Sequence, residues 1–182
     1  MIYQSEQMEK EAILQTAARM CAAARTAPKT RGVDDIYTLV FTEEDKDALE
    51  GKMREFAERE GNEAIREWYQ RDADNVHAAG AVLLVGAKKA YRGVQKCGFC
   101  GFENCGACKA AGANCAYVYV DLGIALSSAA ATAGDERVDS RIMFSVGKAA
   151  MELAFVSKDI VWQGIPLSVG GKNIFFDRKK KG

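Results

Sequence analysis

Apolar residues recur at steps of three and four near the start of the chain and gather later in short continuous runs. Between residues 5 and 24 they form one stripe, which predicts an amphipathic helix. The run IYTLVF, residues 36–41, is β-branched and aromatic and predicts a strand. A second run, AVLLVGA at residues 81–87, predicts a short strand that is buried on both faces.

Further helices are expected on both sides of the second strand. Thr42 precedes three acidic residues, which is typical of a helix start, so helices are expected over residues 43–60 and then 62–71. Small side chains at residues 120–134 favour another helix, although the YVYV just upstream prefers a strand by propensity and leaves its start open. Asp139 or Ser140 is expected to cap one more, ending near residue 157.

The end of the chain predicts a strand from residue 159, a Pro/Gly turn, a second extended piece and a basic tail. The order of elements predicts one mixed α/β or α+β domain over residues 1–182, and we expect the α+β class. A cysteine-rich stretch, residues 95–116, is inserted in its middle and is called the cysteine segment below.

Composition narrows the classes of function. The 25 basic side chains balance the 25 acidic ones, so charge does not indicate nucleic acid as a partner. No apolar run reaches the roughly 18 residues that span a bilayer, and the first residues lack a secretory signal pattern. We therefore expect a cytoplasmic protein with no membrane partner. In that reducing compartment, clustered cysteines are expected to bind metal or to do redox chemistry.

Five of the six cysteines lie within residues 97–115, with the spacing Cys97-x2-Cys100-x4-Cys105-x2-Cys108-x6-Cys115. Thiolates two residues apart can bind one metal centre, because a tight turn points both sulfurs inward. Glycines at residues 98, 101, 106 and 112 give the backbone freedom to make such turns.

Three kinds of site compete for this pattern. A four-cysteine zinc site explains the two Cys-x2-Cys pairs, but typical zinc ribbons separate such pairs by a longer excursion. A disulfide or thiol relay would need only one pair. An iron–sulfur cluster suits compact, glycine-punctuated ligation, and the pattern favours it. The cluster type stays open, because Cys100-x4-Cys105-x2-Cys108 matches the start of the plant-type [2Fe–2S] spacing whereas Cys115 is close by.

The stretches CGFCGFENC, NCAYVYVDLGIALSSA, RVDSRIMFSVGKAAMELA and GIPLSVGGKNIFFDR resemble a family of small uncharacterised prokaryotic proteins that contain a ferredoxin-type domain. The resemblance extends over essentially the whole chain. It implies a [4Fe–4S] cluster with Cys108 as a spare thiol and four ligands, namely Cys97, Cys100, Cys105 and Cys115. No reaction is implied with it.

A second resemblance concerns the fold. AAARTAPKTRGVDDIYTLVF and the later QGIPLS are similar to nitroreductase-like flavoproteins. This similarity implies three layers, with a mixed sheet flanked by helices, and FMN bound at a dimer interface. Cations that would hold the FMN phosphate are Arg25, Lys29, Arg31 and Lys172. The Arg-Arg-Ser-x-Arg segment of those flavoproteins is missing from the first twenty residues.

Two functional classes follow. In the first, the protein is an oxidoreductase in which FMN and the cluster exchange electrons. In the second, it is an electron carrier or sensor that holds a cluster alone. In either class we expect a redox partner protein or a small-molecule electron donor. The small-residue helix and the aromatic residues near the end of the chain predict a homodimer.

Overall fold

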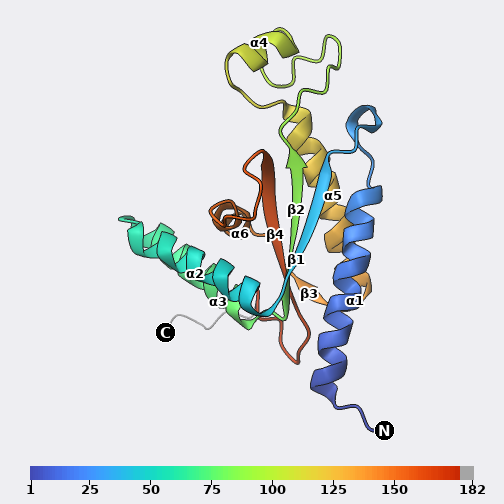
Figure 1. The fold of residues 1–182 in the computed structure, drawn as a ribbon, viewed down its shortest axis with the longest axis vertical. Coiled ribbons are helices and arrows are strands. Elements are labelled where there is room, and N and C mark those ends of the chain that lie inside the picture. Colours follow the sequence, from blue (N-terminus) through green and yellow to red (C-terminus); the bar gives the residue numbers. More distant parts are fainter. Residues whose placement is uncertain (177–182) are drawn as a thin grey trace.

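A four-stranded sheet separates two layers of helices in the computed structural model, which describes residues 1–176 (Figure 1). Helices α1 and α5 cover one face of the sheet, and α2, α3 and α6 cover the other. The helices are α1 Ser5–Thr26, α2 Glu43–Arg59, α3 Glu63–Ala78, α4 Cys105–Ala110, α5 Ala116–Asp135 and α6 Phe144–Ala150, with a 3-10 turn at Thr30–Gly32. The strands are β1 Ile36–Phe41, β2 Ala81–Lys88, β3 Asp139–Ser140 and β4 Ile160–Ser168.

The strand order is β1-β2-β4-β3, and each of these three pairings is antiparallel. The α+β class and the three layers are confirmed, whereas the expected mixed sheet is not seen in residues 1–176. The connections explain the difference. Helices α2 and α3 pack against each other as a hairpin, so β2 begins at the end of the sheet where β1 ends. Strand β2 is therefore antiparallel to β1.

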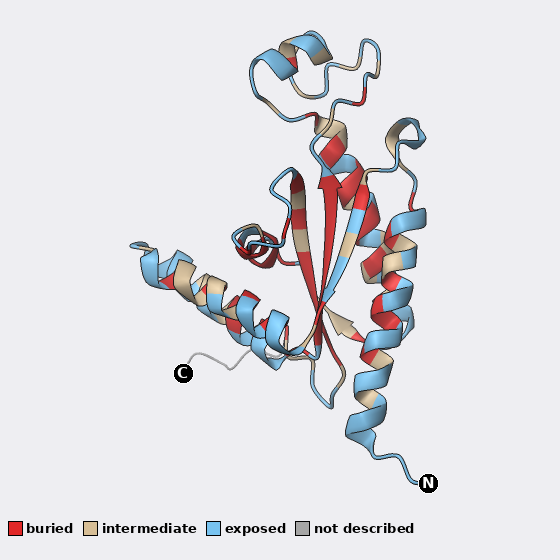
Figure 2. Cartoon of the chain, viewed as in Figure 1, coloured by how far each residue is buried: buried red, intermediate tan, exposed pale blue. Residues whose placement is uncertain are grey.

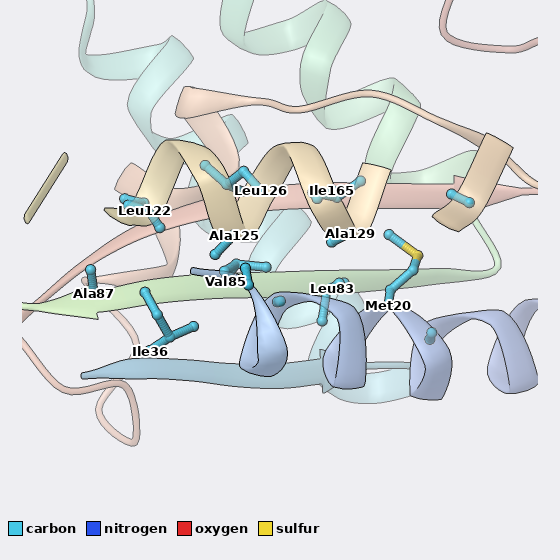
Figure 3. Close-up of a cluster of buried hydrophobic side chains, with 14 of the residues drawn as sticks. Met20, Ile36, Leu83, Val85, Ala87, Leu122, Ala125, Leu126, Ala129 and Ile165 are labelled. Atoms are coloured by element: carbon cyan, nitrogen blue, oxygen red, sulfur yellow. The ribbon is translucent and has the colours of Figure 1, made fainter. Parts of the chain in front are cut away.

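Strand β2 lies at the centre, and its residues 81–87 are all buried, as predicted (Figure 2). Because successive side chains point to opposite faces, Leu83 and Val85 join the core beneath α1 and α5, while Val82 and Leu84 join the core beneath α2 and α6. Figure 3 shows the first of these cores, where Met20 reaches the sheet beside small α5 residues. The small side chains of α5 therefore allow two helices and a sheet to approach closely.

Helix α6 crosses β4 at a point where only glycine fits. A Cβ atom on Gly147 would lie 2.0 Å from the carbonyl oxygen of Trp162, and one on Gly164 would lie 2.0 Å from Cγ1 of Val146. The carbonyl of Trp162 is backbone and cannot move aside as a flexible side chain can, so Gly147 sets the distance between α6 and the sheet, and Gly164 leaves room for Val146.

Several predicted elements are confirmed. The first helix and both early strands occur where the pattern places them. Helix α2 follows Thr42, although the Thr42 side chain makes no cap hydrogen bond. Helix α3 begins after Asn62, whose side-chain oxygen accepts from the backbone N–H groups of Ala64 and Ile65, and it continues to Ala78, beyond the predicted end. Helix α5 includes the YVYV stretch, because Val118 belongs to its buried stripe.

Two predictions near the end of the chain are wrong. Asp139 and Ser140 do not cap a helix; they form β3 by pairing with Ser168 and Leu167 of β4. Helix α6 is consequently only seven residues long. The expected turn at Pro166 is also absent, because β4 continues through it to Ser168. No second strand follows in the part of the chain described, and the basic tail lies outside residues 1–176.

Helix α5 is long and apolar enough to cross a membrane by length and composition, with a mean hydropathy of 1.2 over its most apolar window. Its position gives these apolar residues another role. Residues including Leu122, Ala125 and Ala129 are buried against α1 and the sheet. The apolar residues of α5 are therefore part of the core of the domain.

Candidate metal centre

The cysteine segment lies beyond the end of the sheet. The chain leaves β2 at Lys88 and joins α5 at Ala116, and the intervening residues form a separate lobe that contains α4 (Figure 1). Between residues 89 and 104 the backbone has neither helix nor strand. The predicted insertion is thus placed at one end of the molecule, away from the two helical layers.

Five thiols line one cavity of about 300 Å³ in this lobe, and all of them are free: Cys97, Cys100, Cys105, Cys108 and Cys115. A lone zinc ion would need four sulfurs about 2.3 Å from one point. Within residues 1–176, no three His, Cys, Asp or Glu side chains converge closely enough to hold a single ion. Four cysteine thiolates are the donor set that an iron–sulfur cluster takes, and five thiols border this one cavity.

Two glycines shape the first pair of cysteines. Gly98 and Gly101 each follow a cysteine directly and have φ angles of +60° and +80°, which other residues adopt only at a cost. The N–H of Gly101 donates to the carbonyl of Gly98 over 2.9 Å and closes a tight turn. This turn brings Cys97 and Cys100 to the same cavity, as their spacing predicted.

Helix α4 carries the second pair. The Asn104 side chain accepts a hydrogen bond of 2.9 Å from the N–H of Ala107 and so caps the helix. Cys105 and Cys108 are three residues apart on this helix, so they share one face. Cys115, the last of the five, is the N-cap residue of α5 and links the cavity to the core.

Cys108 is the most enclosed of the five thiols. It is fully buried, and its Sγ donates to the carbonyl of Ala113 over 3.6 Å. Burial raises the pKa of Cys108 to about 11, helped by a hydrogen bond with Cys100 and by the negative charges that Cys100, Cys115 and Cys105 can carry. Without a metal, this thiol stays protonated at neutral pH.

Aromatic side chains form part of the cavity wall. Phe99 stacks on Tyr117 with 5.4 Å between ring centroids, and both rings border the cavity. The outer side of Phe99 is open, since this residue is 69% exposed. Tyr91 donates from its hydroxyl to the carbonyl of Ala113 over 2.9 Å. The cavity thus has an apolar lining and one wall that faces solvent.

A buried arginine ties the lobe to the body. Arg92 is 3% exposed, and its Nε lies 3.0 Å from Oδ2 of Asp121 in α5, while its NH1 lies 2.5 Å from Oδ2 of Asp35 before β1. The other oxygen of Asp121 accepts from the hydroxyl and the N–H of Thr30. Arg31 also donates to the carbonyl of Arg92. Loop, helix and strand therefore meet at Arg92.

Sequence reasoning missed this junction, although one signal was present. Asp121 is the only charged residue between residues 116 and 134, in an otherwise apolar helix. A buried charge needs a partner, so such a residue predicts a buried ion pair. Nothing in the sequence indicated that Arg92, 29 residues away, would supply it.

The four cations predicted to hold a phosphate do not come together in one chain. Arg25 donates to the carbonyl of Ile36 and pairs with Asp34 at 2.8 Å, and Lys29 is largely buried against the carbonyl of Ala27. Arg31 binds the backbone of residues 92 and 93. These three lie at the end of the sheet next to the cysteine segment. Lys172 follows β4 at the opposite end, so the four do not fit one phosphate group.

Comparison with known sequences finds relatives over the whole chain. Residues 111–178 match the family described as "Uncharacterized protein containing a ferredoxin domain (DUF2148)". An uncharacterized protein from Archaeoglobus fulgidus is 37% identical over 189 residues, and the match covers 100% of each chain.

Comparison with solved structures identifies the fold. A FMN and NADPH-dependent nitroreductase from sphigopyxis sp. strain HMH matches with a TM-score of 0.60 and 12% identity, covering 91% of this chain and 83% of the other. A nitroreductase with bound FMN from Bacteroides fragilis matches with a TM-score of 0.58 and 11% identity, covering 85% and 75%. An oxidoreductase containing FMN matches with a TM-score of 0.54 and 14% identity. That match covers 85% of this chain but only 65% of the other protein. The fold is nitroreductase-like.

Proposed function

This chain belongs to the family of uncharacterized proteins containing a ferredoxin domain, and from that premise we propose that it is an iron–sulfur electron-transfer protein. One observation carries the proposal: five free thiols line a single cavity of about 300 Å³. A cluster bound there would supply one-electron transfer. The ligand set that we propose is the one implied by the resemblance, Cys97, Cys100, Cys105 and Cys115, around a [4Fe–4S] cluster.

The residues of the lobe have separable roles in this proposal. The turn through Gly98 and Gly101 and the capped helix α4 position thiols from two directions. The apolar wall of Phe99 and Tyr117 limits access of water, and solvent exposure is one of the factors that set a cluster's potential. The exposed side of Phe99 offers a redox partner protein a short approach to the cavity.

FMN chemistry is the second candidate, and the nitroreductase-like fold favours it. In this form the protein is an oxidoreductase, and FMN supplies hydride or electron-pair chemistry beside the cluster. The four candidate cations of one chain do not form a phosphate site, so we derive no step through FMN. We propose a homodimer in the cytoplasm, with a partner protein or a small molecule as electron donor.

The first experiment is elemental analysis of protein purified without oxygen. We expect iron and acid-labile sulfide in equal amounts, about four of each per chain for a [4Fe–4S] cluster, and broad visible absorption. One zinc per chain without sulfide would contradict the proposal. Flavin fluorescence released on denaturation would support the oxidoreductase, and its absence would leave the carrier or sensor. A monomeric mass by light scattering would contradict the homodimer.

A matched pair of variants tests the location of the cluster. Cys100→Ser should lose iron, because Cys100 lines the cavity and belongs to the proposed ligand set. Cys21→Ser should keep it, since Cys21 lies in α1 and packs against the core rather than the cavity. Equal iron content in the two variants would place the metal elsewhere.

A further inference from the structure

The cavity holds one more thiol than a four-ligand cluster uses, and the two thiols that could exchange differ in their surroundings. Cys97 is half-buried and precedes the turn at Gly98, whereas Cys108 is fully buried on α4. Both line the same cavity as the other three cysteines. Whichever of Cys97 and Cys108 is the fourth ligand, the other therefore remains beside the cluster as a free thiol.

Cys108 is already placed among the three thiols that stay in the set. It borders the same cavity as Cys100, Cys105 and Cys115, and its Sγ donates to the carbonyl of Ala113 over 3.6 Å. Its backbone is fixed on both sides, because its N–H donates to the carbonyl of Asn104 and its carbonyl accepts from the N–H of Ala113. No large movement of α4 is needed for Cys108 to face the cavity.

Cys97 stands in a less constrained stretch. It lies outside any helix or strand, between Lys96 and Gly98, which have φ angles of +56° and +60°. A positive φ is uncommon for lysine and costs energy unless the surroundings hold it. Irregular backbone thus carries Cys97, whereas helix α4 carries Cys108.

We propose that Cys97 and Cys108 are interchangeable fourth ligands of one cluster, with Cys100, Cys105 and Cys115 as the constant three. This inference rests on the proposed function. In the exchange, Cys108 gives up its thiol proton and forms a bond to iron, while the bond from iron to Cys97 breaks and Cys97 takes up the proton. One bond forms, one breaks, and no electron is transferred.

The exchange gives the protein a way to keep its cluster while Cys97 is released. The half-buried Cys97 becomes available to oxidants or to a partner, and the buried Cys108 maintains the fourth bond. The chemical class of agent that would act on released Cys97 is a thiol-reactive electrophile or a mild oxidant.

The first test compares single and double variants purified without oxygen. We expect Cys97→Ser and Cys108→Ser each to retain iron and sulfide at the wild-type ratio, and the double variant to lose both. Loss of iron in either single variant, or its retention in the double variant, would overturn the inference. Cys108→Ala and the circular dichroism spectrum of each variant separate loss of a ligand from failure to fold.

The second test uses the wild-type protein. Iodoacetamide is added to protein that holds its cluster, and the labelled cysteines are identified by mass spectrometry. We expect Cys97 to become alkylated while the iron content and visible absorption remain. Iron loss in step with labelling of Cys97, or no labelling there, would overturn the exchange. If the wild-type protein holds no iron and sulfide, the proposed function fails; if it holds them and a single variant does not, only the exchange fails.

Discussion

Different interactions stabilise the three-layer body and the cysteine segment. In the body, residues 81–87 of β2 are all buried between two helical layers, so apolar contact specifies their positions. In the cysteine segment, Cys108 and Cys115 are buried, and the backbone is set by glycine turns and one helix cap. Apolar packing therefore determines the structure of the body. The structure of the lobe depends on a few hydrogen bonds and, in our proposal, on its cluster.

The contrast makes Arg92 important, because it lies where the two regions meet. Its guanidinium forms ion pairs with Asp121 of α5 and with Asp35 before β1. The predictions below test the strength of this junction, the packing of the body, and the independence of the lobe.

The largest effect is expected at the junction. Arg92→Met leaves two acidic groups without their cationic partner, one of them almost fully buried, and should lower the free energy of unfolding by about 3–5 kcal/mol. The control Arg19→Met removes an exposed pair with Glu136 and should cost about 0.5 kcal/mol. Urea denaturation measures both. A similar small cost for the two variants would mean that Arg92 does not hold the regions together.

The packing of the body is tested at a glycine. Gly147→Ala places a methyl group against the backbone of Trp162 and should destabilise the protein by about 1–3 kcal/mol. Gly51→Ala is the matched control, because Gly51 also lies in a helix but a Cβ there meets nothing within 4 Å. It should stabilise the protein by about 0.5–1 kcal/mol. Equal shifts in melting temperature would contradict the close approach of α6 and β4.

A smaller effect is expected where α2 meets α3. Burial opposes ionisation of Glu50, but hydrogen bonds from Arg54 and His77 outweigh it and lower the pKa of Glu50. The ionised group then stabilises the fold above its ordinary titration range, and this contribution disappears as the pH falls through the lowered pKa. Glu50→Gln should cost about 1 kcal/mol at pH 7.

The pH dependence distinguishes this pair from an ordinary surface charge. The difference between wild type and Glu50→Gln should shrink below about pH 4, where the carboxyl becomes neutral. The exposed Glu58 on the same helix is the control, and Glu58→Gln should cost little stability at pH 7. A constant difference from pH 7 to pH 3 would contradict the assignment.

The smallest effect on the body is expected from removal of the proposed cluster. Chelation should loosen the cysteine segment and speed cleavage by trypsin after the exposed Lys96 and Lys109, while cleavage after Lys10 in α1 stays slow. The free energy of unfolding of the body should not change measurably. Faster cleavage at all three lysines would show that the two regions unfold together.

Much of the body follows from local patterns. The stripe of α1 and the apolar run of β2 are periodic over enough residues that their structure depends little on distant partners. The spacing of the cysteines likewise predicted that they share one site, and all five line one cavity. By contrast, Asp139 is a plausible helix cap by type, and only its pairing with Ser168 makes it part of a strand.

Sequence alone therefore accounts for the class of the fold, the main early elements and the gathering of thiols in one stretch. Tertiary structure decided the ion pairs of Arg92, the antiparallel sheet and the separation of Lys172 from the other three cations. It also decided that Cys108 is buried while Cys97 is only half-buried. The physical reason is that burial and charge pairing depend on residues distant in the chain, whereas periodicity and cysteine spacing are local.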